Sequence, residues 1–214
     1  NYYRANIRQR FYQPLSSQLV FGFQGELGYL DAYGETDETP FFQNFYAGGP
    51  RSLRGFESNT LGPRSTNAPC YEFNYEEETC PNVKDIDGDG ELDTPYYNPY
   101  ANATSRSRYR DRPIGGNIKV EGSLQLIFRL PFIEDQRSIR SAFFFDFGNV
   151  FSDNCKDYQI NCFKPSIDDL RYSYGIGITW ITGFGPLSLA IAKPTNAGPQ
   201  ERTEEFQFTV GNVF

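Results

Sequence analysis

The sequence predicts an all-β fold, a portion of a transmembrane antiparallel β-barrel with about seven meandering strands and one long extracellular loop. Three observations carry this prediction. Aromatic residues make up 17% of the 214 residues, with 20 Phe and 15 Tyr, and there are 20 Gly. Apolar residues alternate with small or polar ones in segments of about ten residues, the length that crosses a bilayer at a tilt. Short connections alternate with long polar ones, as in barrels with short periplasmic turns and long outer loops.

The alternation is clearest near the C-terminal end, in the segment "YSYGIGITW" at residues 172–180. Its large residues, from Tyr172 to Trp180 in steps of two, share one face, while Ser173, Gly175 and their alternate neighbours share the other. Period two with one large apolar face is typical of a half-buried strand. The same pattern predicts further strands at residues 2–13, 18–30, 117–130, 141–151, 187–193 and 206–214.

A soluble β-sandwich is the competing interpretation, because it is also built from alternating strands. A sandwich core would fill the inner faces with bulky side chains, whereas here the faces opposite the Phe-rich ones are rich in Gly and Ser. The sequence has no run of about 18 apolar residues that would predict a transmembrane helix. The net charge of −7 argues against nucleic acid as a partner, since phosphate binding needs a basic surface.

The residue types argue against an enzyme. There is no His, which excludes a His base and a His-bound metal, and no nucleophile–base pair is recognisable. The four cysteines fall in two close pairs, Cys70 with Cys80 and Cys155 with Cys162, both in polar loops. We predict two local disulfides formed in an oxidising compartment. A zinc or redox site is the less favoured alternative, because neither pair has CxxC spacing.

Four strings carry a resemblance to a known family. They are "PFFQNFYAGGPRSLRGFESNTLGPR" at residues 40–64, "AFFFDFGNVF" at residues 142–151, "YGIGITWITGFGPLSLAIAKP" at residues 174–194 and "EEFQFTVGNVF" at residues 204–214. With them the sequence resembles the BamA family of outer-membrane assembly factors. The resemblance covers every predicted strand and the first part of a long extracellular loop at residues 31–116, which carries the RGF motif. TamA and the two-partner-secretion transporters share an RGF-type loop, so an outer-membrane pore or transporter of that type is the alternative.

The resemblance implies a position within a larger protein. Residues 1–214 would be the C-terminal part of a transmembrane β-barrel domain, with the periplasmic POTRA domains and the first barrel strands absent. We therefore expect this portion not to work by itself. Seven strands also do not suit closure, because bacterial single-chain barrels normally have even strand numbers, so an open sheet or a dimer through its edges is expected.

The resemblance also implies a function. Members assemble β-barrel proteins and insert them into the bacterial outer membrane, through a lateral gate at the last strand. The long loops would be extracellular. The implied partners are unfolded outer-membrane protein clients, accessory lipoproteins that bind the POTRA domains, and outer-membrane lipid. No cofactor is required. An outer-membrane protease is a third hypothesis, and the absence of His argues against it.

The motif "LRGF" raises the question of what an arginine does in this loop. The resemblance places the loop inside the barrel, where an unpaired guanidinium is costly and a hydrogen-bonded pair is tolerable. It points to Asp146, on the inner face of a Phe-rich strand, as the partner of Arg54. Gly55 would allow a tight turn and Phe56 would pack beside the arginine stem. A surface arginine in an irregular loop is the alternative.

A second partner of the arginine is usually a glutamate on the preceding strand of the family. The matching position here is Gln125, which can accept a hydrogen bond but carries no charge. Glu121 lies four residues earlier on the same face, and we expect it to supply the missing carboxylate.

The last strand is the second functional element that the resemblance implies. An open strand edge is a template for another chain's strand, and the gate residues would be Phe206, Phe208, Gly211 and Phe214. Gly211 matches the position where the family's last strand kinks, and glycine permits such a bend. Phe214 resembles the aromatic-ended signal by which barrels are recognised. An ordinary final strand is the alternative.

The long loop also contains "DIDGDGELD" at residues 85–93. Alternating acidic residues followed by a glycine resemble the start of a calcium loop. Tyr96 stands where the bidentate glutamate would be, and a solvated acidic loop is the alternative. The candidate calcium ligands are Asp85, Asp87, Asp89, Glu91 and Asp93.

Overall fold

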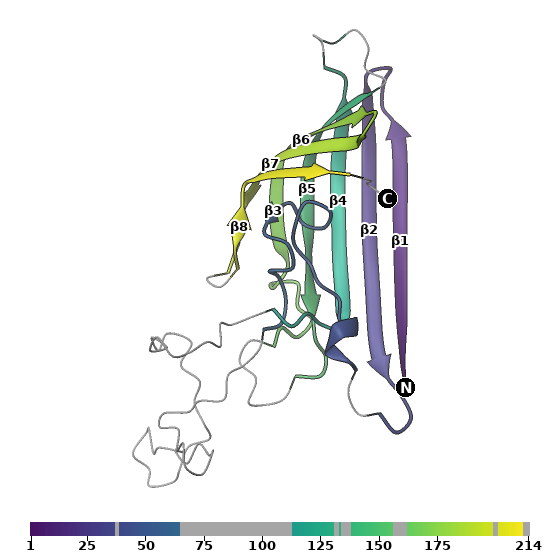
Figure 1. The fold of residues 1–214 in the computed structure, drawn as a ribbon, viewed down its shortest axis with the longest axis vertical. Helices are drawn as coiled ribbons and strands as arrows, with labels where there is room; N and C mark the ends of the chain where they lie inside the picture. The colour runs from purple at the N-terminus through teal and green to yellow at the C-terminus, as the bar shows by residue number, and fades with distance from the viewer. Residues whose placement is uncertain are drawn as a thin grey trace, which may run out of the picture.

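The computed structural model describes residues 1–36, 39–64, 113–130, 133, 138–155, 162–198 and 201–211. Seven strands form one antiparallel sheet in the order β1-β2-β4-β5-β6-β7-β9, so each long strand pairs with the next long strand along the chain (Figure 1). The prediction of about seven meandering strands is confirmed. The strands are β1 Tyr2–Pro14, β2 Leu19–Ala32, β4 Ile118–Phe128, β5 Ile139–Phe151, β6 Arg171–Thr182, β7 Gly185–Pro194 and β9 Phe206–Val210.

The connections alternate in length as the sequence predicts. The links β1–β2, β4–β5 and β6–β7 lie at one end of the sheet, and the links β2–β4 and β5–β6 lie at the other (Figure 1). The β2–β4 link contains a short 3-10 helix, η1 Phe41–Gln43. The described segment that follows this helix runs along one face of the sheet (Figure 1). No helix in the described ranges is long and apolar enough to cross a membrane.

Three strands differ from the prediction. Short strands β3 Gly55–Phe56 and β8 Thr203–Glu204 pair antiparallel, and two residues are too few for a periodic signal. The last strand, predicted to run over residues 206–214, ends at Val210, and Gly211 follows with a φ of 118°. Residues 212–214, including Phe214, lie outside the described residues.

The two faces of the sheet differ in chemistry. The register aligns Leu124 with Phe145 and Phe145 with Tyr174 across three strands, and these large side chains are exposed. A continuous exposed apolar face of this kind is the outer surface of a membrane barrel. In a soluble sandwich the apolar faces would instead be buried between the sheets. The other face is polar and contains buried charged residues, among them Lys119 and Asp146.

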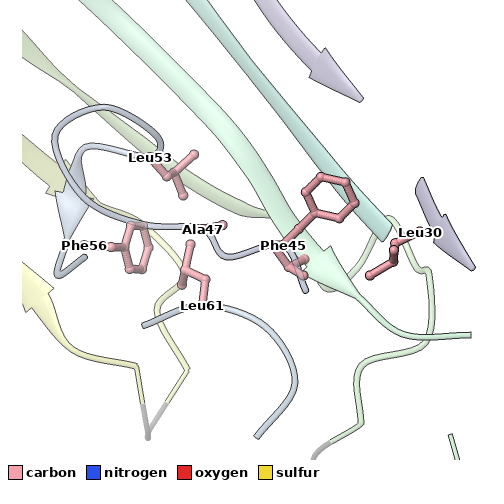
Figure 2. Close-up of a cluster of buried hydrophobic side chains, with 7 residues drawn as sticks. Leu30, Phe45, Ala47, Leu53, Phe56 and Leu61 are labelled. Carbon is pink, nitrogen blue, oxygen red and sulfur yellow. The ribbon is translucent and has the colours of Figure 1, made fainter. Parts of the chain in front are cut away.

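The largest hydrophobic cluster lies between the β2–β4 loop and this inner face (Figure 2). Its loop members come from the segment around the RGF motif, and its sheet members come from β2 and β5. The loop is therefore packed on the inner face by apolar burial as well as by polar contacts. The cluster consists of Leu30, Phe45, Ala47, Leu53, Phe56, Leu61 and Val150.

Within the described residues, β1 and β9 are the two edges of the sheet. Each long strand from β1 to β6 pairs with the next long strand over at least ten residues. The β7–β9 pairing spans only five, from Leu187–Val210 to Ile191–Phe206. The last strand is thus the least extensively paired of the seven.

Candidate functional site

An arginine–carboxylate pair connects the loop to the barrel wall. Arg54 Nε donates to Asp146 Oδ2 at 2.7 Å and Arg54 Nη2 donates to Asp146 Oδ1 at 2.8 Å. These two parallel hydrogen bonds form the bidentate fork that guanidinium geometry favours. The backbone N–H of Arg54 also points to Oδ2, at 3.3 Å. The structure therefore brings together the two residues that the resemblance paired.

The surroundings of this pair are nearly dry. The side chain of Asp146 is 0% exposed and that of Arg54 is 16% exposed. Ser123 accepts from Arg54 Nη2 at 3.1 Å and donates to Asp146 Oδ1 at 2.6 Å. The guanidinium carbon lies 3.4 Å from the centre of the Phe144 ring, a cation–π geometry that strengthens as water is excluded. Each charged group in the pair thus has several partners, which offsets its desolvation.

A glycine on the next strand makes room for the ring below the arginine. Gly175 is paired with Phe144 in the β5–β6 register. A Cβ at Gly175 would lie 2.7 Å from Phe144 Cζ and closer still to the backbone of β7. The small inner face of β6, which the sequence pattern predicted, therefore gives the space that Phe144 and Arg54 occupy.

Gly55 and Phe56 complete the motif. Gly55 has a φ of 90°, a backbone conformation that favours glycine, and a Cβ there would lie 3.2 Å from Ala192 and Pro194 of β7. Phe56 is fully buried in the loop cluster beside Leu53 and Leu61. Its ring thus anchors the loop through apolar burial, in addition to the arginine pair.

We expected Glu121 to supply a carboxylate to Arg54, and this expectation is wrong. Its carboxylate pairs with Lys119 Nζ at 3.0 Å and accepts a hydrogen bond from the hydroxyl of Ser52. Lys119 in turn lies 3.5 Å from Glu26. Glu121 thus holds the loop two residues before the arginine. The side chain of β4 that contacts Arg54 directly is Ser123.

Gln125 contacts the arginine indirectly, through Ser123. Its Nε2 donates to Ser123 Oγ at 3.2 Å, and Ser123 then contacts both members of the Arg54–Asp146 pair. The sequence analysis gave Ser123 and Phe144 no role. The alternation of the two strands places both on the inner face, but only the register shows that Ser123 lies opposite Asp146.

The last strand presents two different faces. Phe206 and Phe208 lie on the apolar outer face, with 60% and 55% of their surfaces exposed. Gln207, between them, points inward and is 2% exposed. The sequence analysis had not singled out Gln207, because a lone glutamine on an inner barrel face is unremarkable until its partners are known.

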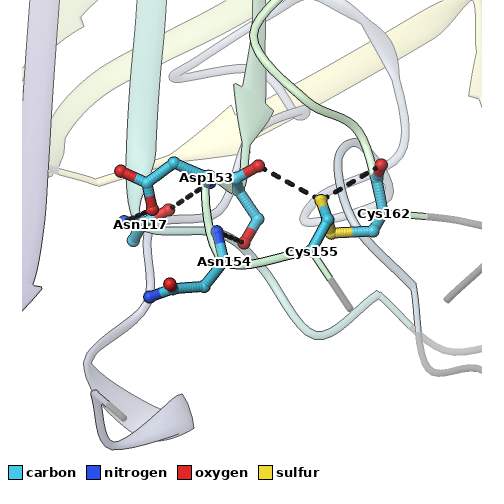
Figure 3. Close-up of a disulfide and its surroundings, with 6 residues drawn as sticks. Asn117, Asp153, Asn154, Cys155 and Cys162 are labelled. Carbon is cyan, nitrogen blue, oxygen red and sulfur yellow. Dashed lines mark hydrogen bonds between the residues drawn. A yellow bond between two sulfur atoms is a disulfide. The ribbon is translucent and has the colours of Figure 1, made fainter. Parts of the chain in front are cut away.

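The structure contains the disulfide between Cys155 and Cys162 (Figure 3). It lies in the β5–β6 connection, next to a polar contact in which Asn117 Nδ2 donates to Asp153 Oδ1 at 2.6 Å. Cys70 and Cys80 lie outside the described residues, as do all five candidate calcium ligands at residues 85–93. In the part of the chain that the structure describes, no cluster of three or more metal-ligating side chains occurs.

An antiparallel membrane sheet with an apolar outer face and a charged inner face, packed against an internal loop, defines an outer-membrane β-barrel protein. The particular family follows from a family model, the Omp85 superfamily domain, which matches residues 1–214. The chain belongs to the Omp85 superfamily.

Two relatives illustrate the similarity. The outer membrane protein assembly factor BamA of Neisseria meningitidis serogroup B (strain MC58) is 30% identical over 229 residues, which cover 100% of this chain. The crystal structure of BamA from Haemophilus ducreyi lacking POTRA domains 1–3 matches with a TM-score of 0.68 and 30% identity over 98% of this chain. The chain spans 24% of the length of the first relative and 35% of the second chain. The predicted membership in a bacterial outer-membrane barrel family is thus confirmed.

Proposed function

We propose that the chain is the C-terminal part of the barrel of a factor that assembles β-barrel proteins and inserts them into the bacterial outer membrane. Membership in the Omp85 superfamily and the similarity to two BamA proteins support this proposal. The single observation that carries it is the buried fork between Arg54 and Asp146. This fork holds the loop at residues 40–64 on the inner face of the sheet. The sequence of that loop resembles the BamA family more than TamA or the transporters.

The mechanism we propose is templating by a strand edge. The backbone N–H and C=O groups on the free side of β9 can hydrogen-bond to an incoming strand, and strand addition of this kind gives main-chain affinity without a particular sequence. The exposed Phe206 and Phe208 would face lipid beside the client. The loop held by Arg54 keeps the lumenal side of this edge ordered while clients change.

The partners and chemistry follow from this mechanism. We propose unfolded outer-membrane proteins as clients, lipid around the barrel, and accessory lipoproteins bound through POTRA domains. We propose no enzymatic step, because strand pairing and insertion break no covalent bond. No cofactor is needed for these steps.

Reconstitution of the full-length protein, with its accessory lipoproteins, into liposomes tests the proposal. The rate at which an unfolded barrel client becomes heat-modifiable on a gel should exceed the rate in empty liposomes. If clients fold no faster than in bare lipid, and the liposomes instead conduct ions or export a single substrate, the pore or transporter alternative replaces the assembly function.

Calcium binding by the acidic loop stays a prediction. Isothermal titration of the protein with calcium should release or absorb heat at up to about millimolar calcium, the weak end of the range for extracellular calcium loops. The double variant Asp87→Asn, Asp89→Asn should lose that heat. A titration without heat would remove calcium from the account.

A further inference from the structure

A side-chain amide joins the last strand to the RGF loop. Gln207 Oε1 accepts from the backbone N–H of Gly55 at 3.3 Å, and Gln207 Nε2 donates to the backbone carbonyl of Phe56 at 2.8 Å. The amide thereby bonds to the backbone on both sides of the Gly55–Phe56 peptide link, much as a strand neighbour would. Because Gln207 is 2% exposed, water does not compete for these groups.

The segment before β9 is tied to the same loop. Strand β8 pairs Glu204 with Gly55 and Thr203 with Phe56. The N–H of Glu57 donates to the carbonyl of Arg202 at 2.9 Å. The loop strand β3 and the approach to the last strand therefore form one hydrogen-bonded unit.

A second buried ion pair holds this unit to the wall. Arg171 of β6 donates from Nε to both carboxylate oxygens of Glu201, at 2.8 and 2.6 Å. The two side chains are 10% and 3% exposed. The unit is thus anchored twice, by Arg54 on Asp146 and by Glu201 on Arg171, while β9 pairs with β7 at five positions in the described part of the chain.

We propose that Gln207 is a positioning residue that couples the RGF loop to the lateral gate. Strand β9 is held from the lumen by the loop as much as from the side by β7, so separating β9 requires breaking the hydrogen bonds of Gln207 as well. The inference deepens the proposed function and rests on it for the meaning of the gate. The geometry of the coupling stands on the contacts alone.

The physical reason for coupling is polar satisfaction. If β9 moves away with Gln207, the N–H of Gly55 and the carbonyl of Phe56 each lose a partner in a buried place, and an unpaired buried polar group is costly. Opening of the gate is therefore easier when the loop loosens as well. By linkage, whatever loosens the loop also favours opening, to the same extent.

Hydrogen exchange tests this coupling in the full-length protein in lipid nanodiscs. Gln207→Leu is compared with wild type and with Thr209→Val, a matched control two residues further along the inner face of β9, where Thr209 lines a cavity together with Lys119 and Glu121. We expect Gln207→Leu to speed exchange of the β9 amides that donate to β7 about tenfold, the size expected for leaving buried polar groups without a partner. The amide of Glu57, which does not bond to Gln207, should speed up as well. Thr209→Val should change neither.

Two results would overturn the inference. One is unchanged exchange throughout β9 in Gln207→Leu, and the other is faster exchange in β9 with an unchanged Glu57 amide. Heat-modifiability checks that each variant is folded, and if Gln207→Leu does not fold, Gln207→Asn, shorter by one methylene, takes its place under the same criteria. Failure of the wild-type protein to accelerate client folding would remove the proposed function but leave the exchange result standing, so the two failures are distinguishable.

Discussion

Replacing Asp146 with alanine is expected to lower the free energy of unfolding by about 3–5 kcal/mol, the cost of leaving a buried charge without its partner. As long as the loop stays on the wall, Arg54 would lie beside Phe144 and Ser123 without the carboxylate that its fork pairs with. The loop would then separate from the wall, or the whole barrel would unfold at lower denaturant. Denaturant unfolding in detergent micelles, followed by tryptophan fluorescence and heat-modifiability, measures the loss.

Arg8→Ala is the matched control for Asp146→Ala. Arg8 and Glu26 also form an ion pair on the inner face, with a separation of 3.1 Å, but the Arg8 side chain is 64% exposed. Exposed ion pairs contribute about 0–1 kcal/mol to stability, so the free energy of unfolding of this variant should be close to that of wild type. Equal losses in the two variants would mean that the buried Arg54–Asp146 pair contributes no more to stability than an exposed ion pair.

Replacing Phe56 with alanine is the second large expected effect. The ring is fully buried among Leu53, Leu61 and other cluster members (Figure 2), and Phe→Ala changes in cores cost about 3–5 kcal/mol through lost burial and the cavity that remains. The same unfolding measurement applies. Limited proteolysis of the loop should also become faster, because polar contacts without the apolar burial of Phe56 would then hold the motif.

Phe184→Ala gives the corresponding control. Phe184 lies in the β6–β7 turn and is 97% exposed, so its removal should change the free energy of unfolding by less than about 0.5 kcal/mol, as is usual for surface substitutions. If Phe56→Ala is as mild as Phe184→Ala, the loop cluster is not what keeps the loop on the inner face.

The strands were predictable because the two faces of a membrane strand differ in chemistry, so that apolar and polar residues alternate along the sequence. Period two in "YSYGIGITW" places Tyr174 outward and Ser173 inward, and the structure agrees, with Tyr174 exposed and Ser173 buried. What the pattern does not contain is a pairing that depends on a long-range contact. The two-residue strands β3 and β8 come together only because the loop returns beside the last strand.

The candidate site was predicted only in part, for a related reason. The resemblance points to Arg54 and Asp146, which lie 92 positions apart, but neighbours on one strand face cannot be ranked without the register. Glu121 carries the negative charge that we expected beside Arg54, but the loop residue that contacts Glu121 is Ser52. Ser123 is opposite Asp146 and therefore receives the arginine. Gln207 became visible only through its contacts with two backbone groups.

The most direct test of the account is the rate of client folding by the full-length assembly in liposomes, with Arg54→Ala compared with Arg51→Ala. Arg51 is an exposed arginine in the same loop, three positions before the motif arginine, so the two variants remove the same charge. The account predicts that Arg51→Ala matches wild type while Arg54→Ala folds clients at a rate close to that of empty liposomes. Equal rates for both variants and wild type would contradict it, because the buried Arg54–Asp146 pair would then be dispensable for assembly.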